Sequence, residues 1–149
     1  MMSKLKSLFK YLFLFLVGGI SYYGIEIAWR GHSHWSMMVL GGLCFVLVGL
    51  INNFFTFDMY MEVQALIGSI IITVLEFCTG MVVNVLLGWN VWDYSNKPLN
   101  IYGQVCIEFT AIWFFLSILI IYVDDYIRYM CFNERYPNNK FWFFQRFFK

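Results

Sequence analysis

The stretch VQALIGSIIITVLEFCTGMVVNVLL, residues 63–87, decides the fold of this chain. It is long enough to cross a bilayer as a helix, because a spanning helix needs about 20 mostly apolar residues at a rise of ~1.5 Å each. Its one charged residue is Glu76. We therefore predict a transmembrane helix that carries a carboxyl group inside the membrane.

Three further segments outside this stretch satisfy the same criterion. They are residues 9–28, 37–55 and 101–123. The whole chain of 149 residues is 61% hydrophobic and only 13% charged, which is more apolar side chain than a soluble domain of this length could bury. Short polar connections between the segments favour antiparallel neighbours. We predict an all-α polytopic membrane protein of four transmembrane helices, arranged as two antiparallel hairpins.

Lysine and arginine set the orientation, because cytoplasmic flanks of membrane spans are enriched in them. The cations are Lys4, Lys6 and Lys10 before the first span and Arg128, Arg135, Lys140, Arg146 and Lys149 after the last, against Arg30 and Lys97 in two loops. We expect a multi-pass protein of the plasma membrane with both termini in the cytoplasm. Any homo-oligomer should be parallel, and a homodimer is expected because four helices are few for a transport pathway.

The C-terminal residues differ in pattern from the spans. Aromatic residues recur at helix-like spacing among cations, at Phe141, Trp142, Phe144, Phe147 and Phe148. This pattern predicts an amphipathic helix lying in the headgroup region. We divide the chain into a four-helix transmembrane domain, residues 1–125, and a cytoplasmic interfacial tail, residues 126–149.

Carboxyl groups gather in the predicted outer half of the membrane. A carboxylate there costs several kcal/mol unless it is protonated, paired or hydrated. Polar residues share one face on each of three helices: Tyr22, Glu26 and Arg30; Glu76, Gly80 and Asn84; Gln104 and Glu108. The inner half is almost wholly apolar, so we expect a polar pocket that opens outward above an apolar floor. The structural alternative is that Glu26 pairs with Arg30 while the other two acids are protonated and hydrogen-bond between helices.

Several classes of function are disfavoured. The net charge of +1 provides no basic field for nucleic acid. The chain has no phosphate-binding loop, nucleophile elbow or zinc-protease motif, so we expect no catalytic residue, no cofactor and no ATP hydrolysis by the chain itself. His32 and His34 lie two positions apart in a loop, a pattern more typical of solvated side chains than of a metal site.

The segment from residue 91 to residue 125 carries a distinctive series of short motifs. They are VWDYS at 91–95, PLN at 98–100, GQVCIEF at 103–109, WFFLS at 113–117 and the pair Asp124-Asp125, together with RGHSHWSM at 30–37 and Gly41-Gly42. In these motifs the chain resembles the CmpB-like family of ABC-transporter type IV permeases over roughly residues 20–128. The resemblance implies a permease subunit that works with a separate ATPase subunit.

The loop at residues 88–100 has a structural interpretation of its own. Asn100 should cap the following helix while Pro98 fixes the approach to it, which would hold Trp92, Asp93 and Tyr94 over the mouth of the pocket as a lid. We therefore predict a ligand- or ion-binding site. Its members are Glu26, Arg30, Glu76, Asn84, Trp92, Asp93, Tyr94, Asn100, Gln104 and Glu108.

Three functions compete. The first is a small multi-pass permease or transporter component with an outward-facing, carboxylate-lined pocket in which Glu76 and Glu108 bind a cation or proton. The second is a non-transporting receptor or assembly factor that presents the loops at residues 29–36 and 88–100 to an envelope ligand. The third, a membrane enzyme using Glu76, Asp93 and Glu108 as acids and bases, lacks a recognisable nucleophile.

Overall fold

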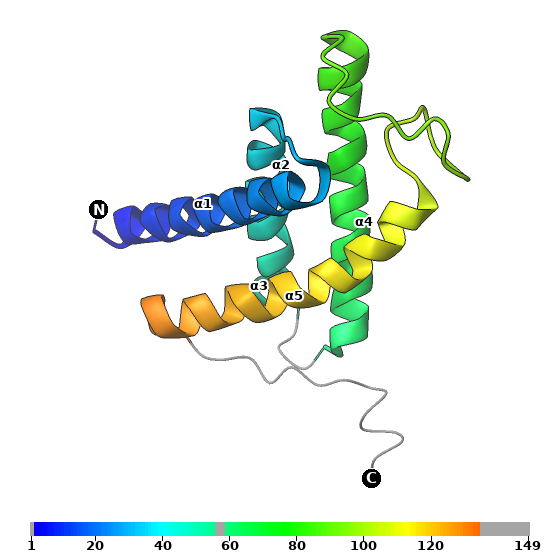
Figure 1. Cartoon of the computed structure of the whole chain (residues 1–149). Helices are drawn as coiled ribbons and strands as arrows, with labels where there is room; N and C mark the ends of the chain where they lie inside the picture. Colours follow the sequence, from blue (N-terminus) through cyan, green and yellow to red (C-terminus); the bar gives the residue numbers. More distant parts are fainter. Residues whose placement is uncertain (1, 56–58, 135–149) are drawn as a thin grey trace.

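The computed structural model describes residues 2–55 and 59–134, and these residues form helices joined by loops. The helices are α1 (Met2–Arg30), α2 (Trp35–Gly49), α3 (Ile51–Phe54), α4 (Met61–Gly80), the π-helix η1 (Met81–Leu86) and α5 (Ile107–Phe132) (Figure 1). Four helical segments are long and apolar enough to cross a membrane: Leu5–Arg30, Trp35–Phe54, Met61–Leu86 and Ile107–Phe132. The prediction of an all-α membrane fold with four spans is confirmed.

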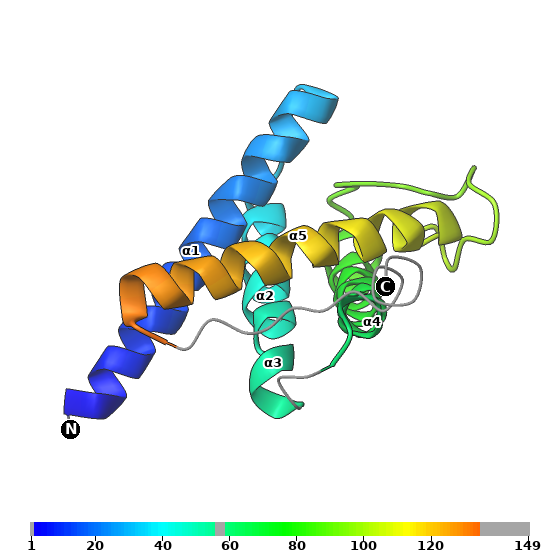
Figure 2. The same cartoon turned by 90° about the horizontal axis from the view of Figure 1, so that it is seen from below.

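Helix α2 lies at the centre of the packing. It contacts α1 extensively and also contacts both α4 and α5, which in turn pack against each other. Figures 1 and 2 show that α4 crosses α5 steeply instead of running alongside it. The arrangement as two antiparallel hairpins is therefore not confirmed. The reason lies in the connection after η1, which is long and internally hydrogen-bonded and so lets α5 begin away from the end of α4.

Close approach of α1 and α2 depends on a glycine. A Cβ atom at Gly18 would lie 2.1 Å from the Cβ of Phe45, a distance that no pair of side chains tolerates. Small residues at helix crossings allow this proximity, and van der Waals packing then holds the helices together in lipid. At the start of α2, the His34 side chain accepts a hydrogen bond from the Ser36 backbone N–H at 3.3 Å and caps the helix.

The last helix differs from its prediction at both ends. It begins at Ile107, after a turn closed by a backbone bridge between Ile101 and Val105. Asn100 does not cap it. The Asn100 side chain instead donates to the Lys97 carbonyl at 2.9 Å. At the other end α5 continues beyond Val123 as far as Phe132, so residues 126–132 are helical; the predicted amphipathic helix in the tail lies outside the described residues.

Beyond Val123, where the predicted last span ends, α5 carries buried polar and charged residues. Asp124, Asp125 and Arg128 are all buried there. Arg128 Nε donates to Asp124 Oδ2 at 2.5 Å, and Asn52 Nδ2 donates to the Asp125 carboxylate at 3.1 Å. Because α5 is longer than the predicted span, residues that follow the apolar run are still part of the helix and are buried.

Candidate functional site

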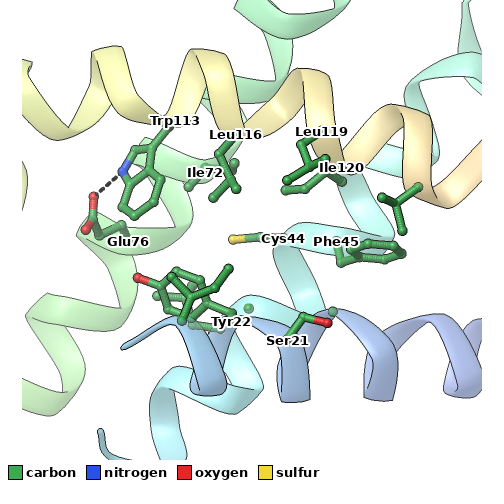
Figure 3. Close-up of a pocket in the computed structure, with 15 residues that line it drawn as sticks. Ser21, Tyr22, Cys44, Phe45, Ile72, Glu76, Trp113, Leu116, Leu119 and Ile120 are labelled. Carbon is green, nitrogen blue, oxygen red and sulfur yellow. Dashed lines mark hydrogen bonds between the residues drawn. The ribbon is translucent and has the colours of Figure 1, made fainter. Parts of the chain in front are cut away.

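Glu76 on α4 is the centre of the candidate site. Its side chain is buried, with 2% of the residue exposed. Oε2 accepts a hydrogen bond from Trp113 Nε1 at 2.9 Å (Figure 3), and Oε1 accepts one from the Tyr94 hydroxyl at 3.2 Å. Glu76 therefore joins α4 to α5 and to the loop at residues 87–106, which we call the capping loop. Within residues 2–55 and 59–134 the structure gives Glu76 no ion-pair partner.

Tyr94 reaches Glu76 from the capping loop and is held by two contacts. Its ring stacks on Phe109 with the ring centroids 4.5 Å apart. Burial, reinforced by the neighbouring Glu76 carboxylate, raises the pKa of the Tyr94 hydroxyl well above its ordinary value of about 10. The hydroxyl is therefore protonated near neutral pH and acts as a donor to Glu76.

Three other predicted residues fasten the capping loop to the end of α4. Asn84, in the π-helix η1, donates to Gln104 Oε1 at 2.8 Å and accepts from the Val91 backbone N–H at 2.7 Å. Trp92 is buried, and its Nε1 donates to the Gln104 carbonyl at 2.9 Å. Single turns of π-helix often occur at functional sites because they re-aim side chains. Here the π-helix directs Asn84 into the loop that covers Glu76.

Asp93 and Asn100 stabilise the capping loop internally and do not contact Glu76. Asp93 Oδ1 accepts hydrogen bonds from the Ser95 hydroxyl at 2.5 Å and the Ser95 backbone N–H at 2.8 Å, and these bonds lower the pKa of Asp93. Asn100 Oδ1 accepts from the Gly103 N–H at 3.0 Å. Gly103 has φ +68, and a Cβ there would lie 2.5 Å from Ser95 Oγ, so this turn requires glycine.

Glu26 and Arg30 form a separate structural connection. Glu26 is buried, and its carboxylate accepts hydrogen bonds from Arg30 Nη2 and from the Ser33 hydroxyl, each at 2.5 Å. Arg30 Nη1 also donates to the Val91 carbonyl at 3.4 Å. The pair thus joins the end of α1 to the capping loop. The sequence left open a structural alternative for these two residues, in which Glu26 pairs with Arg30, and this is the arrangement observed.

The expected row of three acids in one pocket is wrong with respect to Glu108. Since α5 begins at Ile107, Glu108 lies in its first turn and not seven residues inside the membrane. Its side chain is 46% exposed and pairs with Lys97 at 2.8 Å. The hydrogen bond and the nearby negative charge raise the pKa of Lys97. Among the three acids, Glu76 alone combines burial with the lack of a cationic partner in the described residues.

A cavity of about 170 Å³ extends from Glu76 between α1, α2, α4 and α5. Figure 3 shows Glu76 and Trp113 at one end, with Tyr22 beside them and Cys44 and Phe45 further along. The walls are almost entirely hydrocarbon. Sequence reasoning missed Trp113 as a site residue, although a buried indole N–H in a membrane helix needs an acceptor and Glu76 offers one.

These observations define a class: a four-span membrane protein with an apolar cavity that ends at a buried carboxyl group under a hydrogen-bonded loop. The particular family follows from comparison with family models. The model described as "Putative ABC-transporter type IV" matches residues 13–145, and the chain belongs to this family, as its motifs predicted. Searches of curated proteins and of solved structures found no match.

Proposed function

We propose that this chain is the membrane-embedded permease subunit of a transporter and that it binds a cation or proton at Glu76. The observation that carries the proposal is a buried carboxyl group, without an ion-pair partner in the described residues, at the end of a cavity. Such a group costs several kcal/mol in a membrane, and ionisable residues retained there commonly mark substrate or ion pathways. Family membership supports the same assignment.

The capping loop supports an outward-facing site. In the proposed orientation both termini lie in the cytoplasm of a plasma-membrane protein, and the loop covers Glu76 from outside. Reporter fusions at Lys4 and Lys149 should report cytoplasm, whereas fusions at His32 and Lys97 should report the outside. A cytoplasmic signal from the Lys97 fusion would place the site on the other side of the membrane.

The energy source and the assembly follow from what the chain lacks. No nucleotide-binding motif occurs in the sequence, so ATP hydrolysis would belong to a separate ATPase subunit. We propose a parallel homo-oligomer, with the interfacial tail at residues 126–149 on the same side as the ATPase. Four spans per protomer are few for a complete pathway, which favours a homodimer or a second membrane subunit.

The test measures proton flux through the purified full chain in proteoliposomes containing a pH-sensitive dye. The wild type should dissipate an imposed proton gradient faster than empty vesicles, whereas Glu76→Gln should match empty vesicles. Glu108→Gln is the matched control, because it removes the same charge at an exposed position and should retain the flux. A folded Glu76→Gln variant with wild-type flux, or a wild type no faster than empty vesicles, would contradict the proposal.

A second function, a receptor or assembly factor, is favoured by one observation on the loops. Rings of His34 and Trp35 at the start of α2 lie 5.1 Å and 5.6 Å from the Trp89 ring, so the two outer loops form one surface. Trp29, in the last turn of α1, is 84% exposed. A receptor should lose ligand binding on Trp29→Ser and keep it on Glu76→Gln, the opposite of what a permease should show.

A further inference from the structure

Aromatic side chains join α1 and α5 at two points, and one of these points borders the cavity at Glu76. Tyr22 and Trp113 have ring centroids 6.1 Å apart near Glu76, and Phe13 and Phe132 have centroids 6.0 Å apart at the other end of the helix pair. Arg128 of α5 also lies over the Tyr11 ring of α1, 5.6 Å from its centroid. The cavity extends from Tyr22 and Trp113 along both helices, and Cys44 and Phe45 of α2 form part of its wall (Figure 3).

Beyond Tyr22 and Trp113 the cavity reaches the outer surface of the helices. Two of its lining residues, Ser21 on α1 and Leu119 on α5, are exposed, Leu119 at 56%. Both belong to segments that are long and apolar enough to span the membrane. Exposed surface on such segments faces lipid, so the cavity is open sideways to the bilayer.

The walls fit a hydrocarbon chain. Along α5 the lining extends from Trp113 to Val123, ten residues or ~15 Å of helix. The lining side chains between these two residues are leucine and isoleucine, and the lining residues of α2 include Leu40 and Phe45. A polar solute would lose its hydration along this path without gaining partners, whereas an apolar chain would not.

The polar end fits a cationic headgroup. Each Glu76 oxygen accepts one hydrogen bond, from Trp113 or from Tyr94, and a carboxylate oxygen has capacity for a second. Both donors are neutral, so the negative charge is not compensated within the described residues. Arg30 is already paired with Glu26, and Lys97 is already paired with Glu108.

We infer that the cavity binds an amphipathic molecule, a hydrocarbon chain bearing an ammonium headgroup, which enters from the bilayer between α1 and α5 and places its headgroup at Glu76. This inference rests on the proposed function in using the same carboxyl group. It goes further in naming the substrate class and the route of entry.

The test uses the full chain in proteoliposomes and two photoactivatable probes, hexadecylamine and hexadecanol, each with a diazirine in mid-chain. After irradiation, the labelled residues are mapped by peptide mass spectrometry. The amine should label Leu119 and Ile120 in the wild type at least about tenfold more than the alcohol does. Glu76→Gln should reduce labelling by the amine to the level of the alcohol.

Two variants on one helix test the route of entry. Ser21→Phe places a ring in the opening and should reduce labelling by the amine by about tenfold. Gly24→Phe adds the same ring three residues later, where a new side chain meets nothing within 4 Å, and should leave labelling unchanged. Excess unlabelled hexadecylamine should compete in the wild type, a measurement that does not depend on either variant folding.

Any of three outcomes would overturn the inference. The first is equal labelling by amine and alcohol in the wild type, which would mean that ordinary lipid fills the cavity, and the second is unchanged labelling in a folded Ser21→Phe variant. The third is labelling concentrated at Phe115, which is 70% exposed and does not line the cavity. The flux assay separates this result from the proposed function. Flux that depends on Glu76 without selective labelling would retain the permease and reject the amphipathic substrate. Selective labelling without flux would retain the amphipathic ligand and reject the permease.

Discussion

Replacing Arg128 with methionine tests how much the buried charges at the far end of α5 stabilise the fold. The side chains of Arg128 and Asp124 are 4% and 0% exposed, and Arg128 Nε lies 2.5 Å from Asp124 Oδ2. Arg128 Nη1 also lies 3.6 Å from a Glu134 oxygen. Methionine retains much of the arginine stem but removes the charge, so it leaves Asp124 as a buried carboxylate whose nearest cation is gone.

The expected cost follows from this geometry. At 2.5 Å and an effective dielectric constant of about 20, the gross attraction is about 7 kcal/mol, most of which offsets desolvation. Removing one partner of such a pair typically destabilises a protein by about 3–5 kcal/mol, and we expect Arg128→Met to fall in this range. Asp124→Asn should cost less, about 1–3 kcal/mol, because Arg128 keeps Glu134 and an acceptor amide.

The assay is unfolding of the full chain in mixed micelles by sodium dodecyl sulfate, followed by circular dichroism. In an Asp124→Asn background, Arg128→Met should cost much less than in the wild type, because no unpaired carboxylate remains at that position. Lys97→Met, which breaks an exposed pair, is the control and should leave the free energy of unfolding near that of the wild type. An Arg128→Met cost below about 1 kcal/mol, or the same cost in both backgrounds, would refute the reasoning.

Two further predictions concern the capping loop. Gly103→Ala should destabilise the chain by about 1–3 kcal/mol, because φ is +68 and the new Cβ would meet Ser95 Oγ at 2.5 Å; Gly88→Ala, with φ +66 but open space around it, should cost less in the same melting experiment. The folded-state pKa of Lys97 is raised by its bond to Glu108, so the bond stabilises the fold below the ordinary lysine pKa of about 10.4 and is lost as pH rises through the raised value. The small difference in melting temperature between wild type and Lys97→Met at neutral pH should therefore disappear at strongly alkaline pH, and a difference that persists there would show that charge is not its cause.

The spans could be predicted because lipid imposes one simple requirement, a helix-length run of apolar residues. The run at residues 63–87 corresponds to the observed segment Met61–Leu86. The start of α5 could not be predicted in this way, since residues 101–106 are apolar enough to continue a helix. What interrupts it is local: Gly103 adopts positive φ and the backbone of Ile101 pairs with Val105. Hydropathy does not distinguish a buried turn from a helix.

The central residue of the site could also be predicted from the requirements of lipid, but its partners could not. Glu76 was identifiable because a carboxyl group inside a span is costly wherever the neighbouring helices lie. Its partners depend on how those helices cross, and the steep crossing of α4 over α5 is set by the capping loop and not by periodicity (Figure 2). The same dependence explains why Arg128, placed after the last span by its charge, is buried.

The capping loop and the cavity share one carboxyl group, and this connects loop closure to ligand binding. Tyr94 and Trp113 hold Glu76 through neutral donors, so a cation at Glu76 would compete with or reinforce the bond from the loop. Three non-glycine residues of the loop, Asn90, Leu99 and Tyr102, adopt positive φ, a conformation that the surrounding hydrogen bonds must offset. If ligand binding weakens the Tyr94 bond, that strain favours loop opening, and by thermodynamic reciprocity an open loop favours the ligand. Loop opening and ligand binding would then be coupled through Glu76, because both act on the same carboxyl group.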